Sequence, residues 1–357
     1  MAFYPSLRRI ERGAWIAERL LELRASLRAS IPPKSTQDSL LLATWNIREF
    51  DSEKGGERLD DAYFFIAEII SCFDLVAVQE VREDLSALDR VVSILGRRQW
   101  DYIVTDVTEG TSGNGERMAF LYDTRKVTFR GIAGEIVLPK GQGIAEDLQF
   151  ARSPFLVAFQ AGWFKFNIAT VHIYYGEDTG AKLQRRIDEI DALAKFMRKR
   201  ADRAAKASGE NFILLGDFNI ISPEHKTMEA LTRHGFAVPP ELSGAATNLG
   251  GDKHYDQIAF RTRKGELRLG RGLVPGVEGA HKAGAFPYYG IVFRDEDIGV
   301  YAEAAGIELD GEPTAGQKRS YRNWRTYQMS DHLPMWIELQ IDFADDYLTR
   351  LVEANDG

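Results

Sequence analysis

Side chains that can do chemistry stand where six predicted strands begin or end. They are two amides, four carboxylates and two histidines: Asn46, Asn219, Glu80, Asp217, Asp256, Asp331, His172 and His332. A single polar residue at a strand end is usually structural, with its hydrogen bonds satisfied locally. So many of them at equivalent positions are improbable as independent structural features, and we interpret them as one site.

This set of side chains favours metal-assisted hydrolysis of a phosphoester. Oxygen ligands without a thiolate suit a hard cation, Mg²⁺ or Mn²⁺, rather than zinc. Mg²⁺ typically takes one or two protein carboxylates and completes its shell with water and phosphate oxygens of the substrate. Histidines near neutral pKa can remove a proton from water and return one to a leaving oxygen. Amide side chains can donate hydrogen bonds to phosphoryl oxygens.

The segment "NFILLGDFNI" (211–220) illustrates the pattern. An apolar run over 212–215 is followed at once by Asp217 and Asn219, as when a buried strand ends in polar groups. Because alternate residues of a strand share a face, Asp217 and Asn219 are predicted to point the same way. One would then address water and the other the phosphoryl group.

Strands alternating with helices must position these side chains. Apolar runs and alternation predict strands over 40–46, 74–80, 117–123, 154–160, 164–172, 254–260 and 332–341, besides the run at 212–215. Helical periodicity is found over 6–29, 60–73 and 181–206. In the first of these helices the apolar stripe includes Leu20, Leu21 and Leu27. Residues 262–325 lack a clear period and are predicted to form an extended excursion with short elements.

Composition restricts the classes of protein to consider. The chain has 357 residues and a net charge of -8, with a pI of about 5.5, so it lacks the global basic footprint of many nucleic-acid binders. A nuclease is still compatible, because a metal ion supplies local positive charge. Cys72 is the single cysteine, so an intrachain disulfide and a thiolate zinc cluster are both excluded. Neither a signal peptide nor a membrane span is predicted, and we expect a cytosolic protein.

Five segments occur in the order typical of one enzyme family. They are "WNIREF" (45–50), "VQEVRED" (78–84), "GDFN" (216–219), "HYDQI" (254–258) and "SDHLP" (330–334), with His172 between the second and the third. Each segment is a weak signal alone, but the ordered set is strong. Over residues 40–340 the chain resembles the endonuclease/exonuclease/phosphatase superfamily, and within it most resembles deoxyribonuclease I.

The resemblance implies an α+β fold, a four-layer αββα sandwich in which two mixed sheets lie face to face with helices outside. Residues 39–342 would form this domain. Residues 1–38 would add an N-terminal amphipathic helix and linker, and residues 343–357 a C-terminal tail. A metal-dependent site would lie at one edge of the sandwich.

The resemblance also implies roles for individual residues. Glu80 would be the principal Mg²⁺ ligand, with Asn46 beside it and Asp331 close to the metal. Asp217 would position or activate the attacking water, and Asn219 would hold a phosphoryl oxygen.

A second group of roles concerns proton transfer and substrate contact. His332 would act as general base, oriented by Asp256. His172 would act as general acid or phosphate clamp, paired with Glu116. Arginines would contact the substrate, through phosphate or near the nucleic-acid surface: Arg48, Arg82 and Arg152.

Two departures from the deoxyribonuclease pattern bear on the substrate. Asn114 stands where the nuclease pattern has a tyrosine that stacks in the minor groove. The excursion at 262–325 is longer than the corresponding nuclease segment, and its aromatic and basic residues are predicted either to stack unpaired bases or to pack in the core: Tyr288, Tyr289, Tyr321, Trp324 and Arg325.

Three possible functions are compared with the sequence. The preferred interpretation is a Mg²⁺-dependent phosphodiesterase that cleaves nucleic acid, DNA rather than RNA, with no membrane partner. The alternative is a phosphatase or phosphodiesterase acting on a small or lipid phosphate. A binding module without activity would be expected to have lost Glu80, His172, Asp217 or His332, and all four are present.

Overall fold

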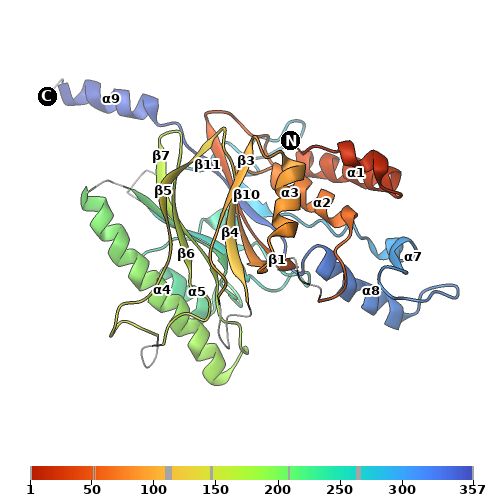
Figure 1. The fold of residues 1–357 in the computed structure, drawn as a ribbon. Coiled ribbons are helices and arrows are strands. Elements are labelled where there is room, and N and C mark those ends of the chain that lie inside the picture. The colour runs from red at the N-terminus through yellow and green to blue at the C-terminus, as the bar shows by residue number, and fades with distance from the viewer. Residues whose placement is uncertain are drawn as a thin grey trace.

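Two β-sheets packed face to face form the centre of the molecule, and helices cover both outer faces (Figure 1). The computed structural model describes residues 2–50, 52, 54–108, 115–144, 148–207, 210–262 and 267–355. The α+β sandwich predicted from the sequence is therefore confirmed. Within the described residues no helix is both long and apolar enough to cross a membrane.

The first sheet has six strands and mixed direction. Its order is β10 (Ala283–Ala285), β11 (Met335–Gln340), β1 (Ser39–Phe50), β2 (Leu75–Val81), β4 (Arg117–Asp123) and β3 (Trp100–Val104). Only β1 and β2 run parallel among these neighbours, with Leu42 opposite Leu75 and Asn46 opposite Gln79.

The second sheet has five strands, again with one parallel pair. Its order is β5 (Val127–Glu135), β6 (Phe155–Ala161), β7 (Phe164–His172), β8 (Asn211–Asp217) and β9 (Asp256–Arg261). β7 and β8 are parallel, and their register places His172 opposite Asp217. The inward faces of both sheets form one apolar layer between them, in which Leu42, Phe120 and Leu215 are fully buried.

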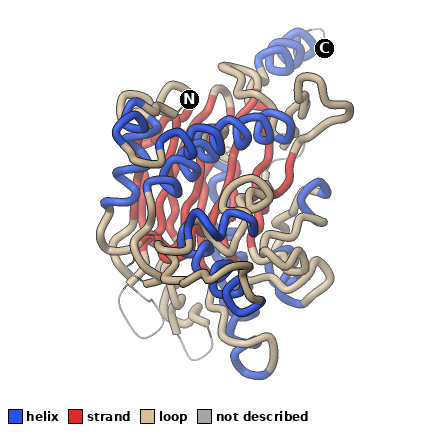
Figure 2. Tube along the Cα trace, turned by 90° about the vertical axis from the view of Figure 1, so that its right-hand side faces the viewer, coloured by secondary structure: helices blue, strands red, loops and turns tan. Residues whose placement is uncertain are grey.

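The outer helices follow from which strand residues point outward. Three helices cover the first sheet: α1 (Gly13–Ser30), α2 (Asp60–Ser71) and α3 (Ser86–Leu95). Two cover the second: α4 (Gly180–Ala207) and α5 (Lys226–Thr232). Figure 2 shows the first set lying across the strands. Each outer layer has its own apolar cluster, separate from the layer between the sheets.

The predicted helix over 6–29 is wrong in two respects. A 3-10 helix, η1 (Pro5–Arg9), comes first, and α1 begins at Gly13, where an added Cβ would lie 2.1 Å from the carbonyl oxygen of Leu7. The buried face of α1 is Ile16, Leu20, Leu23 and Leu27, whereas Leu21 is 69% exposed. The apolar stripe predicted from the sequence does not coincide with the buried face, because leucines occur on more than one face of this helix.

Short or weakly patterned elements were missed. β3, β5 and β10 have no counterpart among the predicted strands, and β5 carries a largely exposed pattern that gives little apolar signal. The remaining elements are α6 (Pro240–Ser243), η2 (Asp295–Asp297), α7 (Ile298–Tyr301), α8 (Ala315–Gln328) and α9 (Ala344–Asn355). The last of these extends away from the sandwich at the C-terminal end (Figure 1).

Residues 286–325 of the excursion pack onto the helical layer of the first sheet. Tyr288, Tyr321 and Trp324 are at most 7% exposed and belong to the same apolar cluster as α1 and α2. Tyr289 packs against that cluster, and its hydroxyl lies within hydrogen-bond distance of the carbonyl oxygens of Arg325 and Ser330. Of the two predicted uses for these aromatic residues, core packing is the one that the structure shows.

Candidate active site

The two parallel strand pairs end at the same edge of the sandwich, where they bring polar side chains together. Asn46 lies near the end of β1, and Asp217 ends β8 in the other sheet. Asn46 Nδ2 donates to Asp217 Oδ2 at 3.0 Å, so one hydrogen bond joins the two sheets at this edge. Gly216 permits the close approach of β8 to β7, since an added Cβ would lie 2.3 Å from the carbonyl oxygen of Val171.

Asp217 is the centre of this arrangement. Its Oδ2 atom lies 3.6 Å from His172 Nε2 and 3.7 Å from His332 Nε2, and the side chain is buried. Burial acts to raise the pKa of Asp217, but the charges of His332 and His172 and the N–H donors of Asn219 and Asn46 outweigh it and lower the pKa. A carboxylate is thus held ionised between two imidazoles.

His332 precedes β11 and is paired with a carboxylate from the other sheet. Its Nδ1 lies 2.7 Å from Asp256 Oδ2, and Asp256 is fully buried at the start of β9. Burial acts to lower the pKa of His332, but Asp256 and Asp217 hold it well above the usual range. Burial raises the pKa of Asp256, and His332 only partly offsets that effect.

His172 has a matching partner. Its Nδ1 lies 2.7 Å from Glu116 Oε2, and Arg152 Nε lies 2.7 Å from the same oxygen. Burial acts to raise the pKa of Glu116, but His172 and Arg152 lower it to about 2. Burial and Arg152 act to lower the pKa of His172, but Glu116 and Asp217 raise it. Two His–carboxylate pairs therefore flank Asp217, one from each side.

Glu80 reaches the site only because β2 departs from regular geometry. Leu75, Ala77 and Gln79 face the other sheet, so strict alternation would turn Glu80 to the helix-covered face. The ladders of β2 with both neighbours shift register at this point, and Glu80 has φ +60°. Its carboxylate consequently accepts from Asn46 Nδ2 at 2.9 Å and from the backbone N–H of Glu49 at 2.8 Å.

Asn219 also has a left-handed backbone, with φ +52°. β8 ends at Asp217, so the rule that alternate residues share a face does not extend to Asn219, and that argument from the sequence is wrong. The backbone N–H of Asn219 donates to Asp217 Oδ1 at 2.9 Å, and Nδ2 donates to the carbonyl oxygen of Ile173 at 2.8 Å. Strained backbone at two residues of one cluster is typical of functional sites.

The cluster fits a divalent cation bound largely through water and substrate. Asn46 Oδ1 is buried without a hydrogen-bond partner, and the half-buried carboxylate of Glu80 lies beside the same amide. Within the described residues, no three His, Cys, Asp or Glu side chains are grouped as a protein cage for a metal. One carboxylate and one amide oxygen match the few protein ligands that Mg²⁺ usually accepts.

Three predicted residues lie outside this network of contacts. Arg48 NH1 lies 3.8 Å from Asp331 Oδ2, and the side chain of Asp331 is 45% exposed at the rim. The Arg48 guanidinium also lies over the ring of Tyr327, 3.9 Å from its centroid. Arg82 is paired with Glu49, whose backbone holds Glu80. Asn114 falls outside the described residues.

Residues without an assigned role in the sequence hold the network in place. Ser330 Oγ donates to the carbonyl oxygen of Asn46 at 2.6 Å and accepts from the backbone N–H of His332 at 3.0 Å. Trp45 Nε1 and the Tyr288 hydroxyl both donate to the carbonyl oxygen of His332. Ser330 was visible in "SDHLP". Tyr288 was expected to stack on bases or to pack in the core, and nothing in the sequence indicated that its hydroxyl would meet the backbone of His332.

Comparisons with known proteins identify the family of the chain and its fold. A family model described as "Endonuclease/Exonuclease/phosphatase family" matches residues 43–273. A search of curated proteins with the sequence finds no match.

Solved structures share the fold at low sequence identity. An endonuclease/exonuclease/phosphatase family protein from Bacteroides thetaiotaomicron superposes with a TM-score of 0.55 at 17% identity, covering 86% of this chain and 99% of its own. A mannosyl-6-phosphatase from the same organism gives 0.53 at 18%, with coverage of 84% and 99%. D. rerio TDP2, complexed with single-strand DNA product, gives 0.51 at 12%, with coverage of 84% and 98%.

Proposed function

Because the chain belongs to the endonuclease/exonuclease/phosphatase family, whose members are phosphoester hydrolases, we propose that it is a divalent-cation-dependent phosphodiesterase that cleaves nucleic acid. The observation that carries this proposal is the position of Asp217. It lies between the His172–Glu116 and His332–Asp256 pairs, and Asn46 donates to it from a third side. The same amide of Asn46 also donates to Glu80. This arrangement supplies an acceptor for water, two proton-bearing imidazoles and an oxygen-rich cation site.

The charges favour particular roles within the site. Asp217 is ionised because of its lowered pKa; it orients the attacking water toward phosphorus and accepts the proton that this water loses as the new P–O bond forms. His172 has a raised pKa, so it carries the proton that the leaving oxygen needs. His332 is held in the imidazolium form by Asp256 and binds a phosphoryl oxygen. This assignment replaces the role of general base that the family resemblance implied for His332.

The other residues orient the substrate. Because an amide NH₂ has two hydrogens, Asn219 can donate to Ile173 and to a phosphoryl oxygen at once. Arg152 keeps Glu116 ionised and directs that carboxylate at His172. Glu80 and Asn46 would hold the cation, which supplies Lewis-acid stabilisation of the charge developing on phosphate.

Two features around the site bear on the size of the substrate, and they favour different answers. An open groove of about 780 Å³, lined by Lys54, Arg82, Glu83 and others, adjoins Glu49 next to Glu80, which suits an extended chain. The cations at the rim are paired with acids, Arg48 with Asp331 and Arg82 with Glu49, which lowers the attraction for a polyanion. The second observation favours the alternative, a hydrolase of a small or lipid phosphate.

The test is hydrolysis by the purified full chain with Mg²⁺ or Mn²⁺. The substrates are bis(p-nitrophenyl) phosphate, p-nitrophenyl phosphate, an inositol phosphate, plasmid, and single- and double-stranded oligonucleotides of DNA and RNA. We expect cleavage of the diester probe and of oligonucleotides, with affinity that falls by about 0.7–0.9 logarithmic units per neutralised phosphate for each tenfold rise in salt. Release of inorganic phosphate from monoesters, with intact oligonucleotides and a shallow salt slope, would identify the alternative.

A matched protein controls for contaminating nuclease. Asp217→Asn keeps the shape of the side chain but removes the charge between the histidines, and it is purified in parallel. Cleavage that persists in that preparation at the wild-type rate belongs to a contaminant. Absence of hydrolysis of every ester by the wild-type chain would contradict the proposed function.

A further inference from the structure

Helix α4 buries two charged side chains one turn apart. Arg186 is 0% exposed and Glu189 is 1% exposed, although the helix lies at the surface of the second sheet. Placing a charge in the interior is costly unless it is fully hydrogen-bonded, and apolar residues would pack this face at no such cost. The hydrogen bonds of the two side chains therefore indicate what the charges accomplish.

Glu189 binds two loops that carry site residues. Its Oε1 accepts from the backbone N–H of Ala151 at 2.7 Å, and its Oε2 accepts from the backbone N–H of Tyr174 at 3.2 Å. Ala151 directly precedes Arg152, and Tyr174 follows His172 by two residues. One carboxylate thus connects the backbone beside the arginine with the backbone beside the histidine.

Arg186 binds the same His172 loop to the loop that follows β8. It donates to the carbonyl oxygens of Tyr175 and Glu177 and to Asp178 Oδ1. It also donates to the carbonyl oxygen of Asn219 at 3.0 Å. Asn219 has the left-handed backbone that lets its N–H reach Asp217, so Arg186 supports a strained residue from outside the site.

We propose that Arg186 and Glu189 are positioning residues of the hydrolytic site. Together they fix three loops on one rigid helix: the loop of Arg152, the loop after His172 and the loop after Asp217. The inference rests on the proposed function, and it adds two residues that touch neither substrate nor cation. Hydrolytic geometry is sensitive to such support, because a displacement of about 1 Å can cost about 10²-fold in rate.

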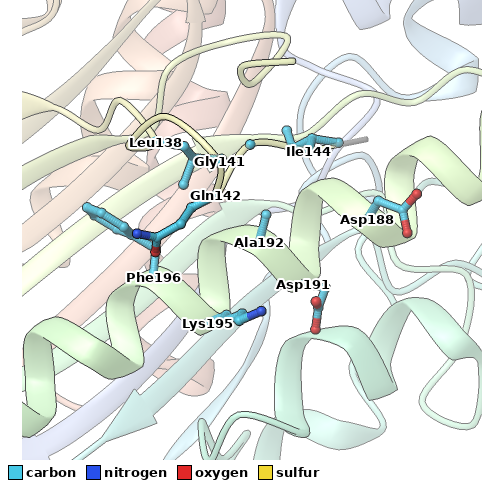
Figure 3. Close-up of a pocket in the computed structure, with 10 residues that line it drawn as sticks. Leu138, Gly141, Gln142, Ile144, Asp188, Asp191, Ala192, Lys195 and Phe196 are labelled. Carbon is cyan, nitrogen blue, oxygen red and sulfur yellow. The ribbon is translucent and has the colours of Figure 1, made fainter. Parts of the chain in front are cut away.

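The neighbouring face of α4 offers matched controls. Figure 3 shows Asp188, Asp191 and Lys195 along a separate pocket of about 390 Å³, which the helix forms with residues 138–144. Asp188 contacts Gln184 on the same helix. Asp188→Asn therefore repeats the chemical change of Glu189→Gln beside it on the helix, without touching the three loops. Arg198→Lys is the matching control for Arg186→Lys, because it makes the same substitution at an exposed arginine that pairs with Asp202 on the same helix.

The experiment combines kinetics with hydrogen exchange. In Glu189→Gln an amide replaces the acceptor of two N–H groups, and in Arg186→Lys the charge remains but the planar fork is lost. Using bis(p-nitrophenyl) phosphate at a temperature where circular dichroism shows each variant folded, we expect kcat to fall about 10- to 100-fold with KM within about twofold. Exchange should rise in peptides covering residues 148–152, 173–178 and 218–221, but not in the core strands.

The outcomes separate this inference from the proposed function. A folded Glu189→Gln or Arg186→Lys variant with kcat within twofold of wild type would overturn the positioning role. So would faster exchange spread evenly over the whole chain, because that is the mark of a merely structural residue. If one variant fails to fold, the other carries the test alone. If the wild-type chain hydrolyses nothing, the proposed function fails, and exchange confined to the three loops still tests whether the helix holds them.

Discussion

Asp217 and the two histidines beside it illustrate how protonation states within one site depend on one another. Carboxylates near both nitrogens of each imidazole raise the pKa of His172 and of His332, and the two imidazoles in turn lower the pKa of Asp217. Removing any member therefore changes the charge of the others. The chemistry of this site belongs to the set rather than to a single residue.

The pH dependence of kcat/KM tests that description. Both histidines have pKa raised above 6.5, while Asp217 has a lowered pKa. With imidazolium ions as the active forms, kcat/KM should be maintained through neutral pH and fall as pH rises through the raised values. His332→Ala should lower kcat by at least about 10²-fold and change the shape of the fall in kcat/KM at high pH. A rate that instead increases with pH over this range would assign His332 as the general base.

Glu80→Gln tests the cation site at the same scale. We expect hydrolysis supported by Mg²⁺ to fall by about a thousandfold or more, since Lewis-acid stabilisation is worth several kcal/mol. The melting temperature without metal should stay close to that of wild type, but its increase on adding Mg²⁺ should be lost. Glu303→Gln, which makes the same change at an exposed position outside the site and the groove, is the control. Retention of most activity by the Glu80 variant would reject the assignment.

At the scale of elements, α1 forms part of the core of the first helical layer. Leu23 is 0% exposed in that apolar cluster, whereas Leu21 on the same helix is 69% exposed. Arg12, just before α1, pairs with the buried Asp61 of α2, and Trp15 donates to the hydroxyl of Tyr301. The helix is therefore connected to both α2 and the excursion.

Two alanine variants compare the faces of α1 directly. Leu23→Ala should lower the free energy of unfolding by about 2–5 kcal/mol, because it removes buried atoms and leaves a cavity. Leu21→Ala should change it by no more than about 0.5 kcal/mol, as expected for an exposed position. Urea denaturation measures both. Equal effects of the two substitutions would show that this helix does not use the buried face described above.

At the scale of the whole molecule, a cluster of charges joins the segment after α1 to the strand ends farthest from the site. Lys34 Nζ lies 2.8 Å from Asp123 Oδ2 and 3.2 Å from Asp74 Oδ1, and Lys126 Nζ lies 2.8 Å from Asp74 Oδ2. Both carboxylates are buried. Arg125 also binds Asp123, at 2.6 Å.

This cluster predicts sensitivity of the fold to acid. Burial acts to raise the pKa of Asp123, but Arg125 and Lys34 hold it well below its usual range. A depressed pKa stabilises the fold fully above the unfolded value, and this contribution is lost as pH falls below it. Asp123→Asn should cost about 1.5–3 kcal/mol at pH 7 and lose less stability than wild type between pH 4 and pH 2, in urea titrations at each pH. Parallel loss in both proteins would exclude Asp123 as a source of acid sensitivity.

The sequence by itself determined the core strands and the types of side chain at their ends. Apolar runs such as 212–215 can only be buried, and the ordered segments around Asn46, Asp217 and His332 have few alternatives in fold or chemistry. β5 was missed because its exposed residues give no periodic signal. The buried face of α1 was assigned wrongly because a search for apolar residues does not distinguish the exposed Leu21 from the buried Leu23.

Tertiary structure decided what depends on backbone strain and on contacts distant in sequence. Glu80 turns into the site through a register shift and a positive φ, against the alternation that its strand predicts. Arg186 and Glu189 look like ordinary surface charges of an amphipathic helix until the loops they bind are folded over them. Periodicity reports which face of an element is apolar. It contains no information on which distant carbonyl or N–H group a buried charge will meet, because that depends on how the loops close over the helix.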